Sequence, residues 1–193
     1  MAGARSAGIP PVARVPSTPV LATLAASALL AAAPAPAPAV ASGAGPCAGA
    51  YEQADLARRR HAVRCLVNQA RAAHGLRRLR PSGALGRAAS GHAQDMVRRD
   101  FFEHTSPGGS TPTARARRAG YRGLAVGETI AFAVGPGATP AGAVSGWLRS
   151  TAHRVVLLDP QMRHIGVGVA DGAPTDGAAG SDGATVVLDV GAP

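Results

Sequence analysis

The chain has 193 residues and a formal net charge of +9, and all 20 of its basic residues are arginine. The arginines are spread along the chain and there are only six aromatic residues, so no stacking platform for a nucleic acid is visible. This composition argues against specific nucleic-acid binding. It leaves room for a loose attraction to anionic surface polymers.

The first 41 residues have the order of an export signal. Arg5 and Arg14 precede an apolar run of 14 residues, 20–33, and small residues surround Ala41. This run is shorter than the roughly 20 residues that a membrane-spanning helix needs. We therefore predict a Sec-type signal peptide over residues 1–41 and a secreted protein, with no transmembrane segment after cleavage. An uncleaved membrane anchor and a disordered Ala/Pro arm are the alternatives.

Residues 42–52 are small and are predicted to form a flexible linker, and residues 53–193 are predicted to form one domain, as a monomer. Cys47 and Cys65 are the only cysteines. In an oxidising environment they are expected to form a disulfide that holds the N-terminal arm on the first helix. Two unpaired structural thiols are the alternative.

The first two helices are indicated by apolar residues at helical spacing. The first extends from about Leu56 to Gly75, and its arginines at 58–60 and 64 are expected to be solvated. The second covers about 85–97 and has His92 inside its apolar stripe. A histidine at such a position is expected to be a packed, hydrogen-bonded core residue.

Thr-Pro pairs at 111–112 and 139–140 are typical helix starts. The second pair opens a helix that includes Trp147, which we interpret as a core anchor. A short helix is expected to follow, from Ser150 or Thr151 to Leu158.

Strands are predicted at 127–134, 165–169 and 185–190. In the second of these, β-branched residues alternate with Gly166 and Gly168, so that something can approach the backbone closely on the glycine face. The third is expected to be its hairpin partner. Helices followed by strands with one more helix between them favour an α+β fold with an antiparallel sheet.

Three polar residues lie where the local pattern changes, namely His104, Glu128 and His153. Two phenylalanines before His104 would hold its turn to the core and point the imidazole outward. A carboxylate at Glu128 is costly to bury unless it meets a cation or hydrogen-bond donors. Their spacing alone does not decide whether these residues form a site, a structural hydrogen-bond cluster, or nothing in common.

The sequence resembles the CAP superfamily (SCP or PR-1-like domains), and is closest to its short bacterial secreted type. The resemblance covers about 66–170 and rests on seven ordered motifs: 66–76, 92–96, 101–107, 120–121, 127–131, 147–154 and 165–169. It implies an α-β-α sandwich with a central antiparallel sheet and one cleft lined by His104, Glu128 and His153. Thr129 departs from the family's usual asparagine, and Ser150 is near the position of a second glutamate found in many eukaryotic members.

We expect a non-enzymatic binding module whose cleft binds a divalent cation, a lipid or a surface ligand, in keeping with the resemblance. Zn²⁺ is the candidate cofactor, with His104 and His153 as ligands and Glu128 as a ligand or an orienting group. The alternative is a metal-dependent or serine-type secreted hydrolase, with Glu128 and His153 as catalytic candidates and Ser106 or Ser150 as nucleophile. A third class is an envelope protein that docks on an anionic cell-wall polymer through its arginines.

Overall fold

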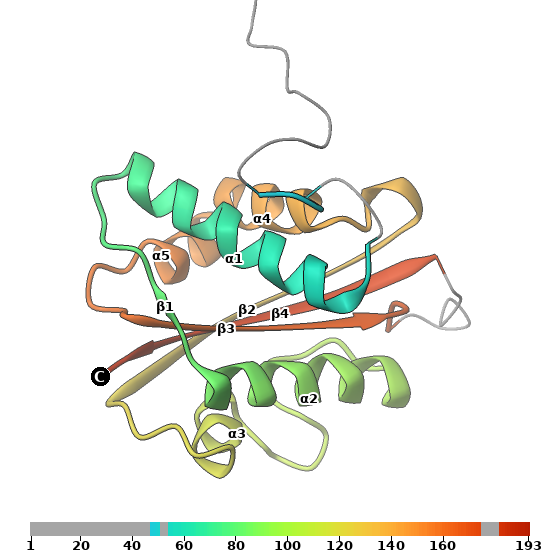
Figure 1. Cartoon of the computed structure of the whole chain (residues 1–193). Coiled ribbons are helices and arrows are strands. Elements are labelled where there is room, and N and C mark those ends of the chain that lie inside the picture. Colours follow the sequence, from blue (N-terminus) through green and yellow to red (C-terminus); the bar gives the residue numbers. More distant parts are fainter. Residues whose placement is uncertain (1–46, 51–53, 175–181) are drawn as a thin grey trace, which may run out of the picture. The chain divides into compact units, whose positions relative to one another are not determined.

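The computed structural model describes residues 47–50, 54–174 and 182–193 (Figure 1). The predicted signal peptide and most of the predicted linker lie outside these residues. Within the described part, no helix combines the length and apolar character needed to cross a membrane.

The centre of the fold is a four-stranded sheet with the order β1-β3-β4-β2. β2 (Ala125–Val134) and β3 (His164–Asp171) both pair antiparallel with β4 (Gly183–Ala192). β1 (Arg80–Pro81) pairs parallel with the first two residues of β3. The long antiparallel strands were predicted; β1 was not, because two residues that include a proline have no periodic pattern.

Helices cover both faces of the sheet (Figure 1). α1 (Leu56–Ala73), α4 (Pro140–Arg149) and α5 (Thr151–Leu157) lie on one face, and α2 (Gly83–Arg99) and α3 (Pro112–Arg118) lie on the other. A short 3-10 turn, η1 (Gly135–Gly137), precedes α4. Both Thr-Pro starts are confirmed: Thr111 accepts a hydrogen bond from the Ala114 amide, and Thr139 accepts one from Gly142. The fold is the predicted α-β-α sandwich.

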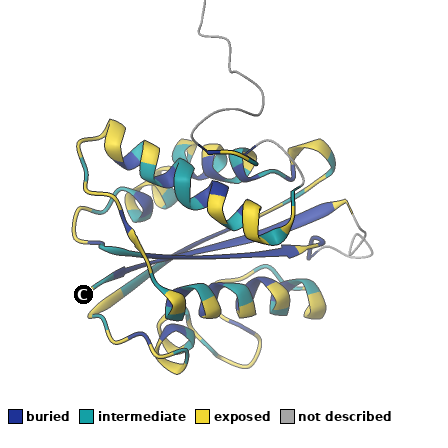
Figure 2. Ribbon diagram, viewed as in Figure 1, coloured by how far each residue is buried: buried dark blue, intermediate teal, exposed yellow. Residues whose placement is uncertain are grey.

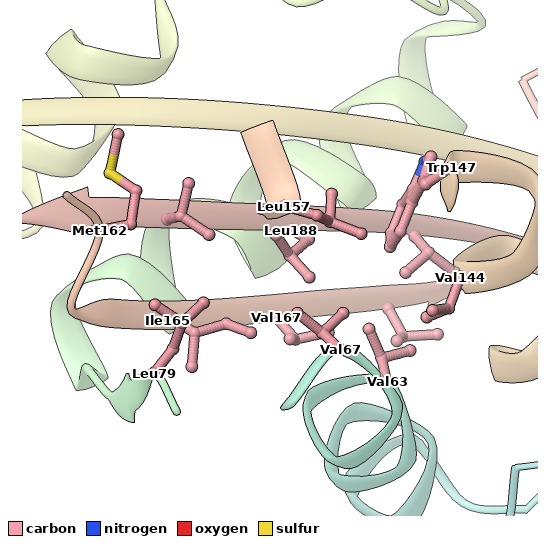
Figure 3. Packing of buried hydrophobic residues seen from close by; sticks show 13 residues of the cluster. Val63, Val67, Leu79, Val144, Trp147, Leu157, Met162, Ile165, Val167 and Leu188 are labelled. Atoms are coloured by element: carbon pink, nitrogen blue, oxygen red, sulfur yellow. The ribbon is translucent and has the colours of Figure 1, made fainter. Parts of the chain in front are cut away.

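β3 and β4 are buried along almost their whole length because helices cover both of their faces (Figure 2). The larger core cluster lies between the sheet and α1, α4 and α5 (Figure 3). Trp147 is 2 % exposed there, and its indole N–H donates to the carbonyl of Ile130 at 3.0 Å. This confirms the interpretation of Trp147 as a core anchor.

α2 packs unusually close to β3 at two glycines. A Cβ atom at Gly166 would lie 2.2 Å from the carbonyl carbon of Leu85, and one at Gly168 would lie 2.3 Å from that of Ala89. Real Cβ atoms do not approach backbone so closely, so only glycine fits. The sequence predicted a close approach to the backbone on the glycine face of this strand, and the element that lies there is α2.

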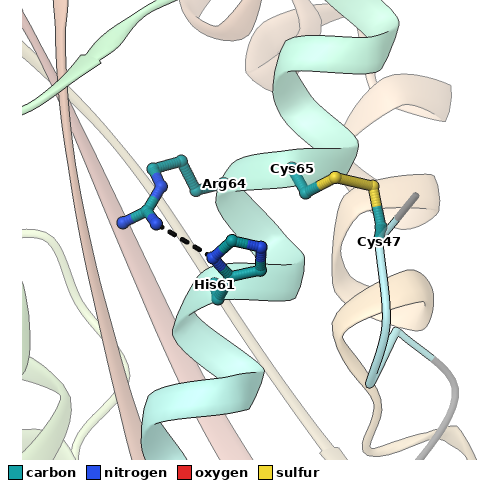
Figure 4. The surroundings of a disulfide bond; sticks show 4 residues. All are labelled: Cys47, His61, Arg64 and Cys65. Carbon is teal, nitrogen blue, oxygen red and sulfur yellow. Dashed lines mark hydrogen bonds between the residues drawn. A yellow bond between two sulfur atoms is a disulfide. The ribbon is translucent and has the colours of Figure 1, made fainter.

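The predicted disulfide joins Cys47 to Cys65 on α1 (Figure 4). It holds the segment 47–50 against the domain, where Ala50 is buried and its carbonyl accepts a hydrogen bond from the Ala141 amide at 2.9 Å. The segment thereby contacts the first turn of α4 as well as α1.

The expectation that the arginines of α1 are all solvated is wrong for Arg59. Its side chain is only 8 % exposed and forms an ion pair with Asp171 at the end of β3. A long arginine side chain can bury its methylene groups and still bring its guanidinium to a partner. The charge of Arg59 was therefore not a reliable sign that its side chain is exposed.

Candidate functional site

Glu128 is the centre of a buried polar cluster on the α2/α3 side of β2. Its side chain is 2 % exposed. One carboxylate oxygen accepts a hydrogen bond from His104 Nδ1 at 2.8 Å, and the other accepts one from an Nη atom of Arg115 at 2.6 Å. The carboxylate thus has the cation and the donors that its burial requires.

His104 lies in the loop between α2 and α3. Phe101 and Phe102 pack against a core cluster between α2 and the sheet that includes Met96 and Ile130. Phe102 also meets Phe132 edge to face, with ring centroids 4.8 Å apart. The loop is thereby held while the His104 side chain stays 50 % exposed. An ionised carboxylate can only accept, so His104 Nδ1 donates the proton in this contact.

Arg115 on α3 is a member of this cluster that the sequence did not identify. Besides Glu128, its guanidinium donates to the carbonyls of Ser110 at 2.6 Å and His104 at 3.0 Å. It therefore ties the loop to the carboxylate. The sequence showed that a buried Glu128 would need a cation. It could not show which residue provides it, because α3 contains three arginines that no local pattern distinguishes.

His92 is fully buried beneath the cluster, as its place in the apolar stripe predicted. Its Nε2 donates to the carbonyl of Glu103 at 2.9 Å and lies 3.9 Å from a Glu128 oxygen. Burial lowers the pKa of His92 and outweighs the opposite effect of Glu128, which favours a neutral ring.

Ser106, one of the two candidate nucleophiles, contacts this buried histidine and not an exposed one. Its hydroxyl is 3.5 Å from His92 Nδ1. A Ser-His-Glu series is therefore present, but Ser106, His92 and Glu128 are all buried. A nucleophile must reach its substrate, so we interpret this series as a structural network.

Asp189 on β4 is directly paired with Glu128 across the two strands. It is fully buried, and among the described residues neither of its oxygens has a hydrogen-bond partner that satisfies normal geometry. Desolvation, and then the negative charge of Glu128, raise the pKa of Asp189 well above its ordinary value. No local signal pointed to this residue, because an aspartate in an alternating strand pattern is usually a solvent-facing position.

His153 lies on α5 and lines a pocket along β2. The pocket has a volume of about 530 Å³ and is also lined by Phe102, Ile130, Phe132 and Trp147. Neither His104 nor Glu128 lines it. The structure therefore brings His104 and Glu128 into contact and places His153 in a pocket farther along the same strand, together with Ser150.

The described residues include no group of three or more His, Cys, Asp or Glu side chains that could hold a metal ion. Both oxygens of Glu128 are already engaged by His104 and Arg115. The donor set around Glu128 thus does not fit a three-ligand zinc site. Zn²⁺ stays a prediction from the sequence.

Comparisons with known proteins agree with the fold and its motifs. The family model of CAP, the cysteine-rich secretory protein family, matches residues 65–188. Protein YkwD of Bacillus subtilis (strain 168) is 33 % identical over 106 residues, which are 55 % of this chain and 40 % of YkwD. The membrane protein YlbC of the same strain is 36 % identical over 104 residues, or 54 % of this chain and 29 % of YlbC. The chain thus spans less than half the length of these two relatives.

Solved structures show the same architecture. An extracellular protein with an SCP domain from Bacillus anthracis (strain Ames) matches with a TM-score of 0.59 and 26 % identity, over 72 % of this chain and 41 % of that one. An outer surface protein of Borrelia burgdorferi matches with a TM-score of 0.56 and 20 % identity, over 68 % of this chain and 90 % of that one. The family match extends over well more than half of the sequence, and the sandwich is the one found in these neighbours. The chain belongs to the CAP family.

Proposed function

We propose that this protein is an exported, non-enzymatic binding module whose pocket along β2 takes the apolar part of a small amphipathic ligand. The disulfide fits an oxidising compartment, and the structural neighbours include an extracellular and an outer surface protein. Export through the predicted signal peptide and monomeric behaviour are parts of this proposal.

The pocket is the observation that carries the proposal. Its volume of about 530 Å³ lies within the range of small-molecule sites, roughly 300–1,000 Å³. Most of its lining is apolar, and the polar groups on α4 and α5 are few: Thr139, Ser145, Arg149, Ser150 and His153. Arg149 and His153 provide positive charge or hydrogen-bond donors. A fatty-acid-like molecule, with a hydrocarbon chain and an anionic head, fits this combination.

Trp147 offers a direct test, because it is the only tryptophan and it lines the pocket. A fluorescent polyene fatty acid bound in the pocket is expected to quench Trp147 by energy transfer, with saturation at one ligand per chain. Unlabelled palmitate should restore the emission by competition. If the probe does not quench Trp147, or if palmitate cannot displace it, the proposal is wrong.

A blocking substitution and a matched control sharpen this test. Gly146 on α4 lines the pocket, and a Cβ there would meet nothing within 4 Å. Gly146→Leu should fill the pocket and weaken probe binding by about tenfold or more, which is a loss of roughly 1.4 kcal/mol. Gly91→Leu on α2 has the same open Cβ position away from the pocket, and should bind the probe like the parent protein.

A serine hydrolase is the competing proposal, and one observation favours it: Ser150 and His153 line the same pocket. A fluorophosphonate probe distinguishes the two proposals, because it labels only an activated serine. We expect no labelling. Labelling that is lost in both Ser150→Ala and His153→Ala would establish the hydrolase.

A further inference from the structure

A second groove lies between α1 and α2, at the edge of β3 that faces away from β4 and that pairs only with the two residues of β1. Its volume is about 770 Å³. The polar side chains in its lining are Arg60, His61, Arg64, Ser82, Arg87, Ser90 and Gln94. It shares no residue with the pocket along β2.

The residues that line this groove carry a net positive charge. Its lining contains three arginines and a histidine but no aspartate or glutamate. Within the part of the chain that the structure describes, Arg60, Arg64 and Arg87 form no ion pair, whereas Arg58, Arg59, Arg98 and Arg99 each pair with an aspartate. Arg64 contacts the neighbouring His61, at 3.0 Å (Figure 4). Arg87 donates to the backbone carbonyl of Ala119 at 2.9 Å, which leaves its charge without a carboxylate partner. Guanidinium groups that have no carboxylate partner and lie in a concave surface focus positive potential on an anionic ligand.

The start of α2 adds to this potential. Ser82 caps the helix and Gly83 begins it, and both line the groove. The first turn of this 17-residue helix contains no acidic residue. The partial positive charge of the helix terminus therefore faces the same space as the arginines.

The size of the groove indicates more than one anionic group. Its lining extends from Gly83 to Gln94 on α2, which at 1.5 Å per residue is about 16 Å, and from Ala57 to Arg64 on α1, about 10 Å. A single phosphate would occupy only a small part of this length. Arginine forks and a helix N-terminus together match the several oxygens of phosphate.

We propose that this groove binds a chain of consecutive phosphate groups, such as an anionic envelope polymer or an inorganic polyphosphate. Arg60 and Arg64 contact the chain from α1, and Arg87 and the first turn of α2 contact it from the opposite wall. The chain occupies a surface separate from the apolar pocket, so the protein can hold a small ligand and an anionic polymer at the same time.

The test is calorimetric titration of the exported protein with short-chain polyphosphate, at low and at moderate salt. The groove variant Arg60→Ala/Arg64→Ala/Arg87→Ala removes the three contacts. A control variant, Arg77→Ala/Arg117→Ala/Arg122→Ala, loses the same charge at exposed positions outside the groove. We expect the groove variant to bind at least about tenfold more weakly and the control variant to stay within about twofold of the parent protein.

Equal weakening in both variants would show that only overall charge matters, and would overturn the proposal. Equally tight binding of polyglutamate and polyphosphate would also overturn it, because the groove would then not distinguish phosphate from carboxylate groups. If inorganic orthophosphate bound as tightly as polyphosphate, the proposal that the ligand is a chain of consecutive phosphate groups would be wrong. If the triple variant does not fold, Arg87→Glu, at an exposed position, must show the loss. A poly(glycerol phosphate) that competes with polyphosphate would identify an envelope polymer as a source of the ligand.

Discussion

Glu128 on β2 and Asp189 on β4 occupy directly paired positions of the sheet, and among the described residues Glu128 forms an ion pair with Arg115 whereas Asp189 forms none. Arg115 and His104 engage Glu128, while Asp189 stays fully buried without them. Two carboxylates at paired positions repel each other when both are ionised. Burial and the neighbouring Glu128 carboxylate therefore both raise the pKa of Asp189 and favour its protonated form.

The first prediction concerns how the raised pKa of Asp189 makes the stability of the protein depend on pH. Its pKa is raised in the folded protein, so its contribution to stability is fully present below its unfolded-state pKa, near 3.8. This contribution falls as the pH rises through the folded-state pKa. An asparagine side chain cannot ionise, so Asp189→Asn should be more stable than the parent protein at pH 7. The difference should shrink as the pH falls toward 3.8.

Urea unfolding at a series of pH values measures this difference directly. A difference that is independent of pH would contradict a raised pKa of Asp189 in the folded protein. Glu128→Gln serves as the comparison, because it leaves Arg115 without its partner and should destabilise the protein at pH 7.

The second prediction concerns Arg115. Its side chain is 10 % exposed and its removal leaves Glu128 as an unpaired buried charge, so Arg115→Ala should lower the free energy of unfolding by about 3–5 kcal/mol. Arg117→Ala on the same helix removes an exposed side chain and should change it by no more than about 0.5 kcal/mol. Chemical denaturation of both variants provides the comparison. Similar values for the two would show that the ion pair does not support the fold.

The third prediction separates the two histidines. His153 lines the pocket and His104 does not, so His153→Ala should weaken binding of the fatty-acid probe while His104→Ala leaves it unchanged. Trp147 quenching measures both variants. Zinc titrations followed by native mass spectrometry provide the converse check. If both substitutions abolished binding of one zinc ion, the two histidines would share a site and the pocket would have to be reinterpreted.

The fourth prediction concerns the close approach of α2 to β3. Gly168→Ala would place a Cβ 2.3 Å from the Ala89 backbone and should force the two elements apart, with a loss of about 3 kcal/mol or more. Gly91→Ala adds the same methyl group in open space on α2 and should be neutral, or stabilising by up to about 1 kcal/mol. Thermal unfolding of the two variants measures the contrast, and a tolerated alanine at 168 would show that the packing can relax.

The fifth prediction concerns the disulfide. Replacing Cys47 and Cys65 with alanine opens a loop of 18 residues and should lower the free energy of unfolding by about 3 kcal/mol. The segment 47–50 also contacts α4 through the Ala141–Ala50 hydrogen bond. Hydrogen exchange should therefore increase at the start of α4. Unchanged exchange there would show that the segment stays in place without its disulfide.

Much of the fold was determined by the local sequence. The helical spacing on α1 and α2, the Thr-Pro starts of α3 and α4, and the alternation of Val and Gly in β3 each reflect forces between residues close in the chain. The two cysteines could pair only with each other within the chain. For the same reason the resemblance to the CAP family was visible in short, ordered motifs.

The partners of the candidate site were decided only by the tertiary structure. The sequence indicated that a buried Glu128 needs a cation, but Arg115, Arg117 and Arg118 lie within one turn of α3, and only packing selects Arg115. Asp189 became buried because its register on β4 places it opposite Glu128, beneath helices distant in sequence. The packing of α5 also decides that His153 lines the pocket along β2, whose lining includes neither His104 nor Glu128. These are long-range relations of register, packing and desolvation, which no local pattern of residue types encodes.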